Sequence, residues 1–422
     1  MRKSQVYFDN ASTTSLHPRV WRAMVPYFTR DYGNPSNLYE IGRCAKQAIT
    51  KALVQITQVL HCRPDEFVFT GSATEADNLA LAGTARAHKT EGNQIIISAL
   101  EHKGIMAVAE ALEKEGFEVI KLPVGKDGLV SLEEVKKNLN DKTIIVSVTM
   151  ADSETGTLQP ISEISLLIKN FRGEKSLPYF HTDASQAAAY AEINVEKLGV
   201  DLLTLSAHKL HGPKGIGGLY VRRGLKLNPI IYGGGQQGRL RSGTENVPAI
   251  VGFGLALELN EASRKKDLGR VKKLRDALQK GIFKTVKKVV LNGHSTKRLP
   301  NFLNISILDV EGESLLLELD EYGIMINTGS ACNSESLEPS YVLTALGNPY
   351  EFVHGSVRFT LSTETKMSDV NYVLKYLPAI VERLRKISPL NLSLGEKKTM
   401  SDPRAFIGGQ TPHFLRKKNV KK

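Results

Sequence analysis

Lys209 places a primary amine directly after an apolar run, DLLTLS (201–206), in the segment SAHKLHGPKGIGG. Asp183 places a carboxylate at the end of the preceding run, PYFHTD (178–183). If these runs are neighbouring parallel strands, both groups lie at one edge of a sheet. There a carboxylate can hold a pyridinium nitrogen while an amine forms a Schiff base with an aldehyde. The glycines after Lys209 also fit a phosphate cradle or a plain tight turn.

A second segment, FTGSATEADN (69–78), has the composition of an anion-binding site. The backbone amides of residues 71–74 open a predicted helix, and the partial positive charge of a helix N-terminus attracts phosphate. Ser206 and His208 supply further donors from the other side. Plain helix capping by Ser72 accounts for the same residues equally well, so the phosphate prediction depends on the neighbouring groups.

Two further loops carry groups that suit a cofactor site. His102 follows the run QIIIS (94–98), where its ring could stack on a flat cofactor and exchange protons with a substrate. An ordinary hydrogen-bonded loop histidine is the alternative. The glycine-rich stretch GGGQQGRLRSGTEN (233–246) contains Thr244 and two arginines. This composition suits either a flexible surface loop or a phosphate reached from a neighbouring subunit.

The sequence contains three cysteines and no CxxC pair, so it predicts neither a disulfide framework nor a zinc site. Cys44 and Cys62 lie in predicted helices, whereas Cys332 has small and polar neighbours in NTGSACNSES. A nucleophilic thiol on such a loop can accept a group at one site and transfer it at another. Arg358, in SVRFTLS, provides a guanidinium fork for a substrate carboxylate or for a structural ion pair.

Short β-rich runs alternate with helix-length amphipathic stretches over residues 64–221, a pattern typical of a mainly parallel sheet covered by helices. Residues 248–282 predict a long helix, and the remainder predicts a smaller α/β unit with an antiparallel sheet and a last helix over 367–386. A nicotinamide-dependent dehydrogenase would share the alternating pattern, but the first strand–helix turn lacks GxGxxG. The predicted strands of the large sheet are EFVFT (66–70), QIIIS (94–98), EVIKL (118–122), TIIVSV (143–148), PYFHTD (178–183), DLLTLS (201–206) and GLYV (218–221).

Composition places the chain among ordinary globular proteins, with 422 residues of which 41% are hydrophobic and 24% charged. The start MRKSQVYFDN lacks an apolar signal region and no run is long enough to span a bilayer, which predicts a cytoplasmic protein. Half of the formal charge of +12 lies in residues 391–422. We therefore expect a flexible basic tail that could bind RNA or an acidic partner.

The order and spacing of these segments resemble the class-V, fold-type-I enzymes that use pyridoxal 5′-phosphate (PLP), and among them the cysteine desulfurases of the NifS/IscS kind. The resemblance covers residues 6–390, and the TGSACNS loop points to the IscS-like group. It rests on YFDNASTT, GNPSNLYEIG, TGSATEADN, EHK, SETGTLQP, HTDASQ, SAHKLHGPKGIGGLYVRRG, GGGQ, RSGTENV, EGESLL, TGSACNS, LEPSYVLTALG and VRFTLS.

The resemblance implies the PLP-dependent transferase fold of type I, an α/β fold in two domains. The large domain, 16–262, would hold a mainly parallel seven-stranded sheet with helices on both faces. A smaller α/β domain, formed by 1–15 and 263–390, would carry the cysteine loop. The basic tail, 391–422, would lie outside both.

Site roles follow from the same resemblance. Lys209 would form the Schiff base with PLP, Asp183 would hold the pyridine nitrogen, His102 would stack on the ring and act in catalysis, and Cys332 would carry the persulfide. The remaining roles are phosphate binding by Ala73, Thr74, Ser206, His208 and, from the second subunit of a homodimer, Thr244; contact with the phenolic oxygen by Gln186 and Ser153; and substrate-carboxylate binding by Asn34 and Arg358.

The activity implied is conversion of L-cysteine to L-alanine, with sulfur passing to Cys332 and then to an acceptor such as an Fe–S scaffold or a tRNA-thiolation protein. No resident metal is expected, although the Cys332 sulfur could pass into an Fe–S cluster. The alternatives are selenocysteine lyase activity, and a weakly active or non-catalytic module of the same fold that binds partners through its basic tail.

One departure from the family pattern concerns the cofactor directly. Asp152 and Ser153 stand where the family usually has two asparagines, the second of which bonds the phenolic oxygen of PLP. A serine hydroxyl can donate the same bond but is shorter, and a carboxylate nearby disfavours a phenolate. We therefore expect altered electronic properties of the cofactor with activity retained.

Overall fold

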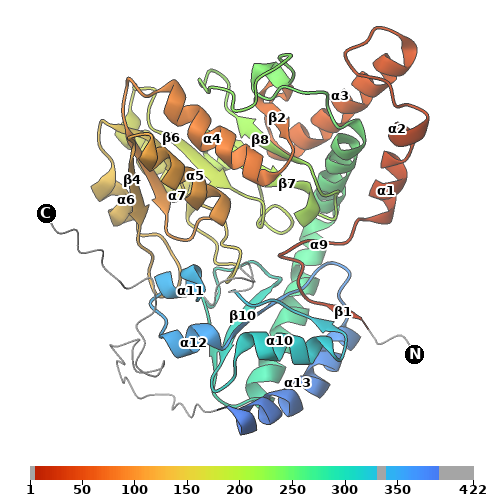
Figure 1. Cartoon of the computed structure of the whole chain (residues 1–422), viewed down its shortest axis with the longest axis vertical. Coiled ribbons are helices and arrows are strands. Elements are labelled where there is room, and N and C mark those ends of the chain that lie inside the picture. Colours follow the sequence, from red (N-terminus) through yellow and green to blue (C-terminus); the bar gives the residue numbers. More distant parts are fainter. Residues whose placement is uncertain (1–4, 330–338, 389–422) are drawn as a thin grey trace, which may run out of the picture. The chain divides into compact units, whose positions relative to one another are not determined.

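Seven strands form the largest sheet in the order β2-β8-β7-β6-β5-β3-β4 of this computed structural model, which describes residues 5–329 and 339–388 (Figure 1). All run parallel except β8, which is antiparallel to both of its neighbours. The prediction of a mainly parallel seven-stranded sheet is confirmed, and each predicted strand matches the observed one to within a residue at either end. The strands are β2 (Phe67–Thr70), β3 (Gln94–Ser98), β4 (Glu118–Leu122), β5 (Thr143–Ser147), β6 (Tyr179–Asp183), β7 (Leu202–Ser206) and β8 (Gly217–Val221).

Helices cover both faces of this sheet, which is why its central strands are continuous apolar runs instead of alternating ones. Ile95 and Ile97 of β3 pack in a cluster with α4 and α5, while Ile96 packs in a separate cluster with α3 and α7. All residues of β3, β5, β6 and β7 are buried. The covering helices are α3 (Glu40–Leu60), α4 (Ala73–Ala87), α5 (Lys103–Lys114), α6 (Leu132–Asn138) and α7 (Ile161–Arg172).

The predicted long helix is present as α9 (Val247–Thr285). Its first turn is capped by Asn246, whose side chain accepts a hydrogen bond from the Ala249 amide at 3.2 Å. Figure 1 shows α9 running from α1 and α3 to α13, and it packs against all three. The remaining helices are α1 (Pro18–Met24), α2 (Pro26–Thr29), α8 (Val195–Leu198), α10 (Gly312–Asp320), α11 (Tyr341–Ala345), α12 (Tyr350–His354) and α13 (Met367–Ile387).

Two smaller sheets bring the start of the chain next to its later part. The antiparallel sheet β12-β10-β9 consists of β12 (Ser356–Thr360), β10 (Phe302–Ile307) and β9 (Val289–Leu291). Strand β1 (Val6–Tyr7) pairs in parallel with β11 (Ile324–Met325). Residues after β1 are thereby held beside β12, where the Ala11 amide donates to Thr360 Oγ1 at 2.9 Å.

Residues 1–390 group as one unit by their contacts. The division of this unit into domains of 16–262 and of 1–15 with 263–390 stays a prediction. None of the helices in the described part of the chain is both long and apolar enough to cross a membrane. Within the same residues, no cluster of His, Cys, Asp and Glu is arranged to bind a metal ion.

Candidate active site

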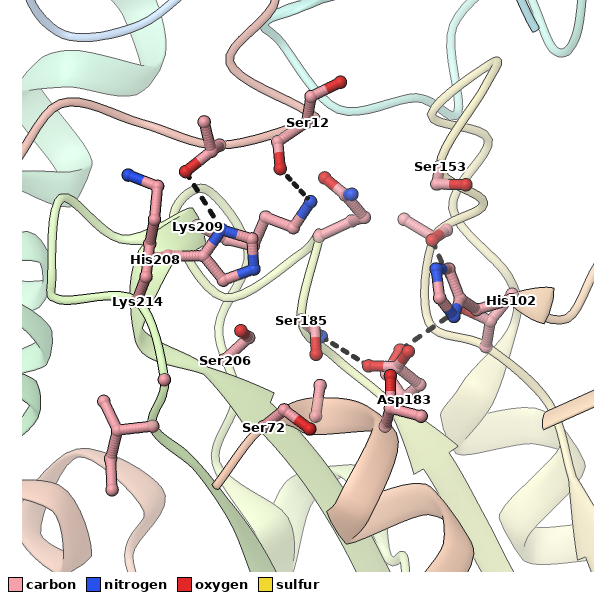
Figure 2. A pocket seen from close by; sticks show the side chains of 18 of the residues that line it. Ser12, Ser72, His102, Ser153, Asp183, Ser185, Ser206, His208, Lys209 and Lys214 are labelled. Atoms are coloured by element: carbon pink, nitrogen blue, oxygen red, sulfur yellow. Dashed lines mark hydrogen bonds between the residues drawn. The ribbon is translucent and has the colours of Figure 1, made fainter. Parts of the chain in front are cut away.

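A cavity of about 550 Å³ lies at the carboxyl ends of β2, β3, β5, β6 and β7 (Figure 2). This is the edge at which the loops of a parallel sheet converge. Figure 2 shows Lys209 and His102 on opposite sides of the cavity, with Asp183, Ser206 and Ser72 along its lower edge in this view. Most of the predicted site residues line it: Ala73, Thr74, His102, Ser153, Asp183, Gln186, Ser206, His208 and Lys209.

Lys209 ends the short 3₁₀ turn Ala207–Lys209 that follows β7. Its ammonium group donates hydrogen bonds to the backbone carbonyls of Ala11 and Ser12, the second at 2.9 Å. The Gln186 amide also donates to the Ala11 carbonyl, at 3.0 Å. The segment after β1 therefore forms one wall of the cavity. Its lining residues Ser12 and Thr13 lie within the quoted YFDNASTT motif but were not predicted as site residues.

Asp183 is the last residue of β6 and is 8% exposed. Its carboxylate accepts a hydrogen bond from the Ser185 amide at 2.8 Å. Behind it, Asp77 of α4 is fully buried, and burial together with the nearby Asp183 charge raises the pKa of Asp77 well above its usual value. Burial thus favours the neutral form of Asp77, while the carboxyl group that lines the cavity belongs to Asp183.

His102 caps α5, and its Nδ1 atom accepts a hydrogen bond from the Gly104 amide at 3.1 Å. Desolvation within the cavity, reinforced by Lys209 and Lys103, lowers the pKa of His102, while Asp183 opposes the shift. The ring is thus neutral at pH 7, and the bond to Nδ1 assigns its proton to Nε2. His102 can therefore donate a hydrogen bond from Nε2.

The N-terminus of α4 opens into the cavity at Ala73 and Thr74. Ser72 caps this helix, because its Oγ atom accepts a hydrogen bond from the Glu75 amide at 3.1 Å. The helix N-terminus is therefore capped by Ser72 and also faces the cavity. Ser206 and His208 line the cavity as well. Burial and the charges of Lys209 and Lys214 lower the pKa of His208 to about 4, which leaves it neutral.

Ser153 and Asp152 have different environments. Ser153 lines the cavity, whereas Asp152 is 1% exposed and its carboxylate accepts hydrogen bonds from the amides of Glu154 at 2.9 Å and Thr157 at 3.0 Å. It also accepts from the Thr155 amide at 2.6 Å. The Asp152 carboxylate thus organises its own loop, and any effect it has on a cofactor is exerted from outside the cavity lining.

Arg358 does not line the cavity itself but lies directly behind residues that do. It forms an ion pair with Asp9 at 2.8 Å and donates to the Ser153 carbonyl at 2.7 Å and to Ser12 Oγ at 3.0 Å. Its Nε atom is buried and lacks a hydrogen-bond partner among the described residues. The structural ion pair that the sequence left open as an alternative is therefore present.

Besides Arg358, two predicted residues, Asn34 and Thr244, do not line this cavity. Asn34 is exposed and its side chain accepts a bond from the Ser36 amide at 2.9 Å, away from the lining residues. Thr244 is exposed near the end of the glycine-rich stretch, before α9. Cys332 lies outside the described residues. Their predicted roles stay predictions.

The residues present fit PLP by their chemistry. An amine, a carboxylate, a neutral imidazole and a helix N-terminus surround one cavity, and these are the groups that a pyridine aldehyde bearing a phosphate requires. The site also depends on a close backbone approach, because a Cβ atom on Gly217 would lie 2.6 Å from the Ser72 carbonyl carbon and 2.7 Å from the Ala73 nitrogen.

The family model of the aminotransferase class-V proteins matches residues 6–373 of the chain. A protein of Dictyoglomus turgidum named cysteine desulfurase IscS is 45% identical over 387 residues, which cover 92% of this chain and 97% of the relative. A cysteine desulfurase IscS of Methanosarcina thermophila is 47% identical, with coverage of 91% of this chain and 94% of the relative.

The fold has solved counterparts. A structure titled NifS-like protein superimposes with a TM-score of 0.85 at 34% sequence identity. The superposition covers 90% of this chain and 100% of that one. The predicted type I fold is thereby confirmed over the same part of the chain in which the sequence motifs occur.

Proposed function

We propose that this chain, which belongs to the aminotransferase class-V family, is a PLP-dependent cysteine desulfurase that converts L-cysteine to L-alanine. The observation that carries this proposal is the convergence of Lys209, Asp183 and His102 on one cavity at the N-terminus of α4. The cofactor of the family, PLP, matches the chemistry of these groups. The relatives named cysteine desulfurase support the choice of substrate.

The residues that would hold the cofactor fall into two groups, one for the aldehyde and the ring and one for the phosphate. Lys209 would bind the aldehyde carbon covalently, and the Asp183 carboxylate would keep a proton on the pyridine nitrogen. His102 would lie against the ring, with Ser153 and Gln186 toward the phenolic oxygen. The phosphate would be bound by residues Ala73, Thr74, Ser206 and His208. Bound PLP supplies an electron sink for bond cleavage at the substrate carbon atoms.

Lys209 has a second task once cysteine has displaced it. Its free amine would remove the proton from Cα of the substrate, since Lys209 would then be the basic group next to the reacting centre. In the structure, the Lys209 amine is already held by the carbonyls of Ala11 and Ser12. These two acceptors give the amine a defined position when it is not covalently bound.

Sulfur leaves the substrate by attack of the Cys332 thiolate on the substrate sulfur. An S–S bond forms as the Cβ–S bond breaks, and the electron pair of that bond remains with the carbon skeleton, which takes up protons and leaves as alanine. Cys332 retains the sulfur as a persulfide. Arg358 and Asn34 would bind the substrate carboxylate, and the contacts of Arg358 with the cavity-lining residues Ser153 and Ser12 support its part in this.

The Cys332 thiol must be ionised to act, because a thiol with a pKa near 8.5 is only about a few per cent thiolate at neutral pH. We assign its proton to the substrate amine, not to His102. Nδ1 of His102 already accepts the Gly104 amide, so Nε2 carries a proton and cannot accept another while this tautomer persists. His102 would instead donate a hydrogen bond from Nε2 within the cavity.

Several further properties belong to the same proposal. The protein would act as a cytoplasmic homodimer in which Thr244 reaches the phosphate of the neighbouring subunit, as its exposure allows. The persulfide would pass to an acceptor protein of Fe–S assembly or tRNA thiolation, because a persulfide has to be consumed for turnover to continue. The basic tail 391–422 would bind RNA or an acidic partner through its charge.

Replacement of Cys332 by serine tests the proposed function. The Cys332→Ser protein should bind PLP and remain yellow, but release no alanine from cysteine and carry no extra sulfur by mass spectrometry. A Cys44→Ser variant should behave as wild type. Undiminished alanine release by Cys332→Ser would contradict the proposal.

A further inference from the structure

Glu154 contacts both ends of the segment in which Cys332 lies. Its Oε2 atom accepts a hydrogen bond from the Ser340 hydroxyl, on the C-terminal side of that segment. On the N-terminal side, a Cβ atom on Gly329 would lie only 2.2 Å from Glu154 Oε2. The Gly329 backbone therefore lies directly against the same carboxyl oxygen. Segment 330–338 itself lies outside the described residues.

The Ser340 end is also tied to the cavity lining by its own helix. Ser340 Oγ accepts a hydrogen bond from the Leu343 amide at 3.1 Å and so caps α11, which leaves the hydroxyl proton for Glu154. Tyr341 of the same helix donates to the backbone carbonyl of Glu101 at 2.6 Å, next to His102. The C-terminal end is thereby fixed to residues adjacent to both His102 and Ser153.

The other end is tied to the predicted substrate-binding arginine. The amide of Arg358 donates to the Asn327 carbonyl at 2.7 Å, and the Asn327 amide donates to the Arg358 carbonyl at 3.2 Å. Thr328, between Asn327 and Gly329, is 2% exposed. Glu154 itself is held from the β10 side, where the Asn304 side chain donates to its carbonyl at 3.0 Å.

We propose that Glu154 is a positioning residue for sulfur transfer, which fixes Gly329 and Ser340 so that the chain between them can present the Cys332 thiol to the substrate. This inference rests on the proposed function. Glu154 follows Ser153 but is 6% exposed and does not line the cavity. Its contribution therefore acts through Ser340 and Gly329, without contact with the cofactor.

The charge state of Glu154 gives this role a pH dependence. Burial, with Asp152 adding to the effect, raises the pKa of Glu154 to about 7, while the Ser340 hydrogen bond, Arg358 and Lys103 oppose the shift. The carboxylate accepts the Ser340 proton more strongly than the neutral acid does. The hold on Ser340 therefore weakens as the pH falls through about 7.

The raised pKa of Glu154 affects the free energy of unfolding in the opposite direction, because it stabilises the folded protein at low pH. A carboxyl group whose pKa is higher in the folded state contributes stability at low pH, and that contribution is lost as the pH rises toward about 7. The Glu154→Gln side chain stays neutral at every pH, so the variant does not lose stability as the pH rises. It keeps the size of the side chain and an oxygen atom that can accept a hydrogen bond. Above pH 7 the variant should therefore melt no lower than wild type, although its hold on Ser340 is weaker.

The test measures the single-turnover rate of persulfide formation on Cys332 in PLP-loaded protein between about pH 6 and about pH 9. Glu154→Gln should be about three- to tenfold slower above pH 8 and should lack a rate inflection near 7. Its visible spectrum and melting temperature should not fall below those of wild type. Glu163→Gln, an exposed change on α7, is the matched control and should follow wild type.

A second pair of variants tests the contact without relying on charge. Gly329→Ala should slow persulfide formation strongly in the wild-type background and much less in Glu154→Ala, because the colliding oxygen is then absent. Additive effects, or a Glu154→Gln rate and pH profile equal to wild type, would overturn the positioning role. Absence of any persulfide in wild type would instead refute the proposed function.

Discussion

At the scale of single residues, Ser153 separates this chain most clearly from the family pattern. It lines the cavity, while its neighbour Asp152 uses its carboxylate to bind the amides of its own loop. The position that would contact the phenolic oxygen of PLP therefore carries a hydroxyl group, which has a shorter reach than an asparagine amide. The serine at position 153 therefore affects the hydrogen bonding of the cofactor more than the conformation of the loop.

Ser153→Asn should shift the pH titration of the visible absorption of the PLP-loaded protein to lower pH by about one unit. The longer amide would donate a hydrogen bond that favours the ionised phenolic oxygen. The measurement is an absorption titration, with exposed Ser131→Asn as control. Superimposable titration curves for Ser153→Asn and wild type would show that the Ser153 hydroxyl already favours the ionised phenolic oxygen as strongly as an asparagine amide does.

The main site residues could be predicted from the sequence because parallel strands deliver their carboxyl ends to one edge. Lys209 and Asp183 follow neighbouring strands, and His102 follows β3 of the same sheet. The ion pair of Arg358 with Asp9 could not be predicted, since it joins the two ends of the chain through tertiary contacts alone. Glu154 was missed for the same reason, because its partners Gly329 and Ser340 are remote in sequence.

At the scale of secondary-structure elements, the strands of the large sheet could be predicted because buried parallel strands are continuous β-branched runs. The antiparallel direction of β8 could not be predicted from such a run, because it depends on how the connection 207–216, which carries Lys209, turns the chain back beside β7. Strands β1 and β11 contain two residues each and have no periodicity to read.

The start of β8 allows a direct test, because Gly217 lies against the turn that begins α4. Gly217→Ala should lower the stability by about 1–3 kcal/mol and weaken PLP binding, since its Cβ would collide with the Ser72 and Ala73 backbone. Thermal melting and PLP titration measure the two effects. Gly269→Ala, whose Cβ would meet nothing within 4 Å, should be neutral or slightly stabilising. Equal behaviour of the two variants would contradict the close approach.

At the scale of the whole molecule, Thr244 is exposed and does not line the cavity of its own chain. The proposed homodimer accounts for this, because the residue would then complete the phosphate site of the second subunit. Arg241 of the same glycine-rich stretch already forms an ion pair within its own chain, with Glu75 of α4 at 2.9 Å.

Mixing two inactive variants tests this subunit arrangement. Thr244→Asp would place a negative charge against the neighbouring phosphate, and Lys209→Ala removes the covalent link to PLP. A hybrid dimer has one site with both changes and one with neither, so joint refolding should restore desulfurase activity. Mixtures that stay inactive despite proven hybrid formation would place Thr244 in its own subunit's site.

The central claim is that Lys209 binds PLP covalently within the cavity, and peptide mapping after borohydride treatment tests it most directly. The purified protein should be yellow, and borohydride should fix the coenzyme on the peptide that contains Lys209. A colourless protein that takes up no PLP, or a coenzyme fixed on another lysine, would contradict the account.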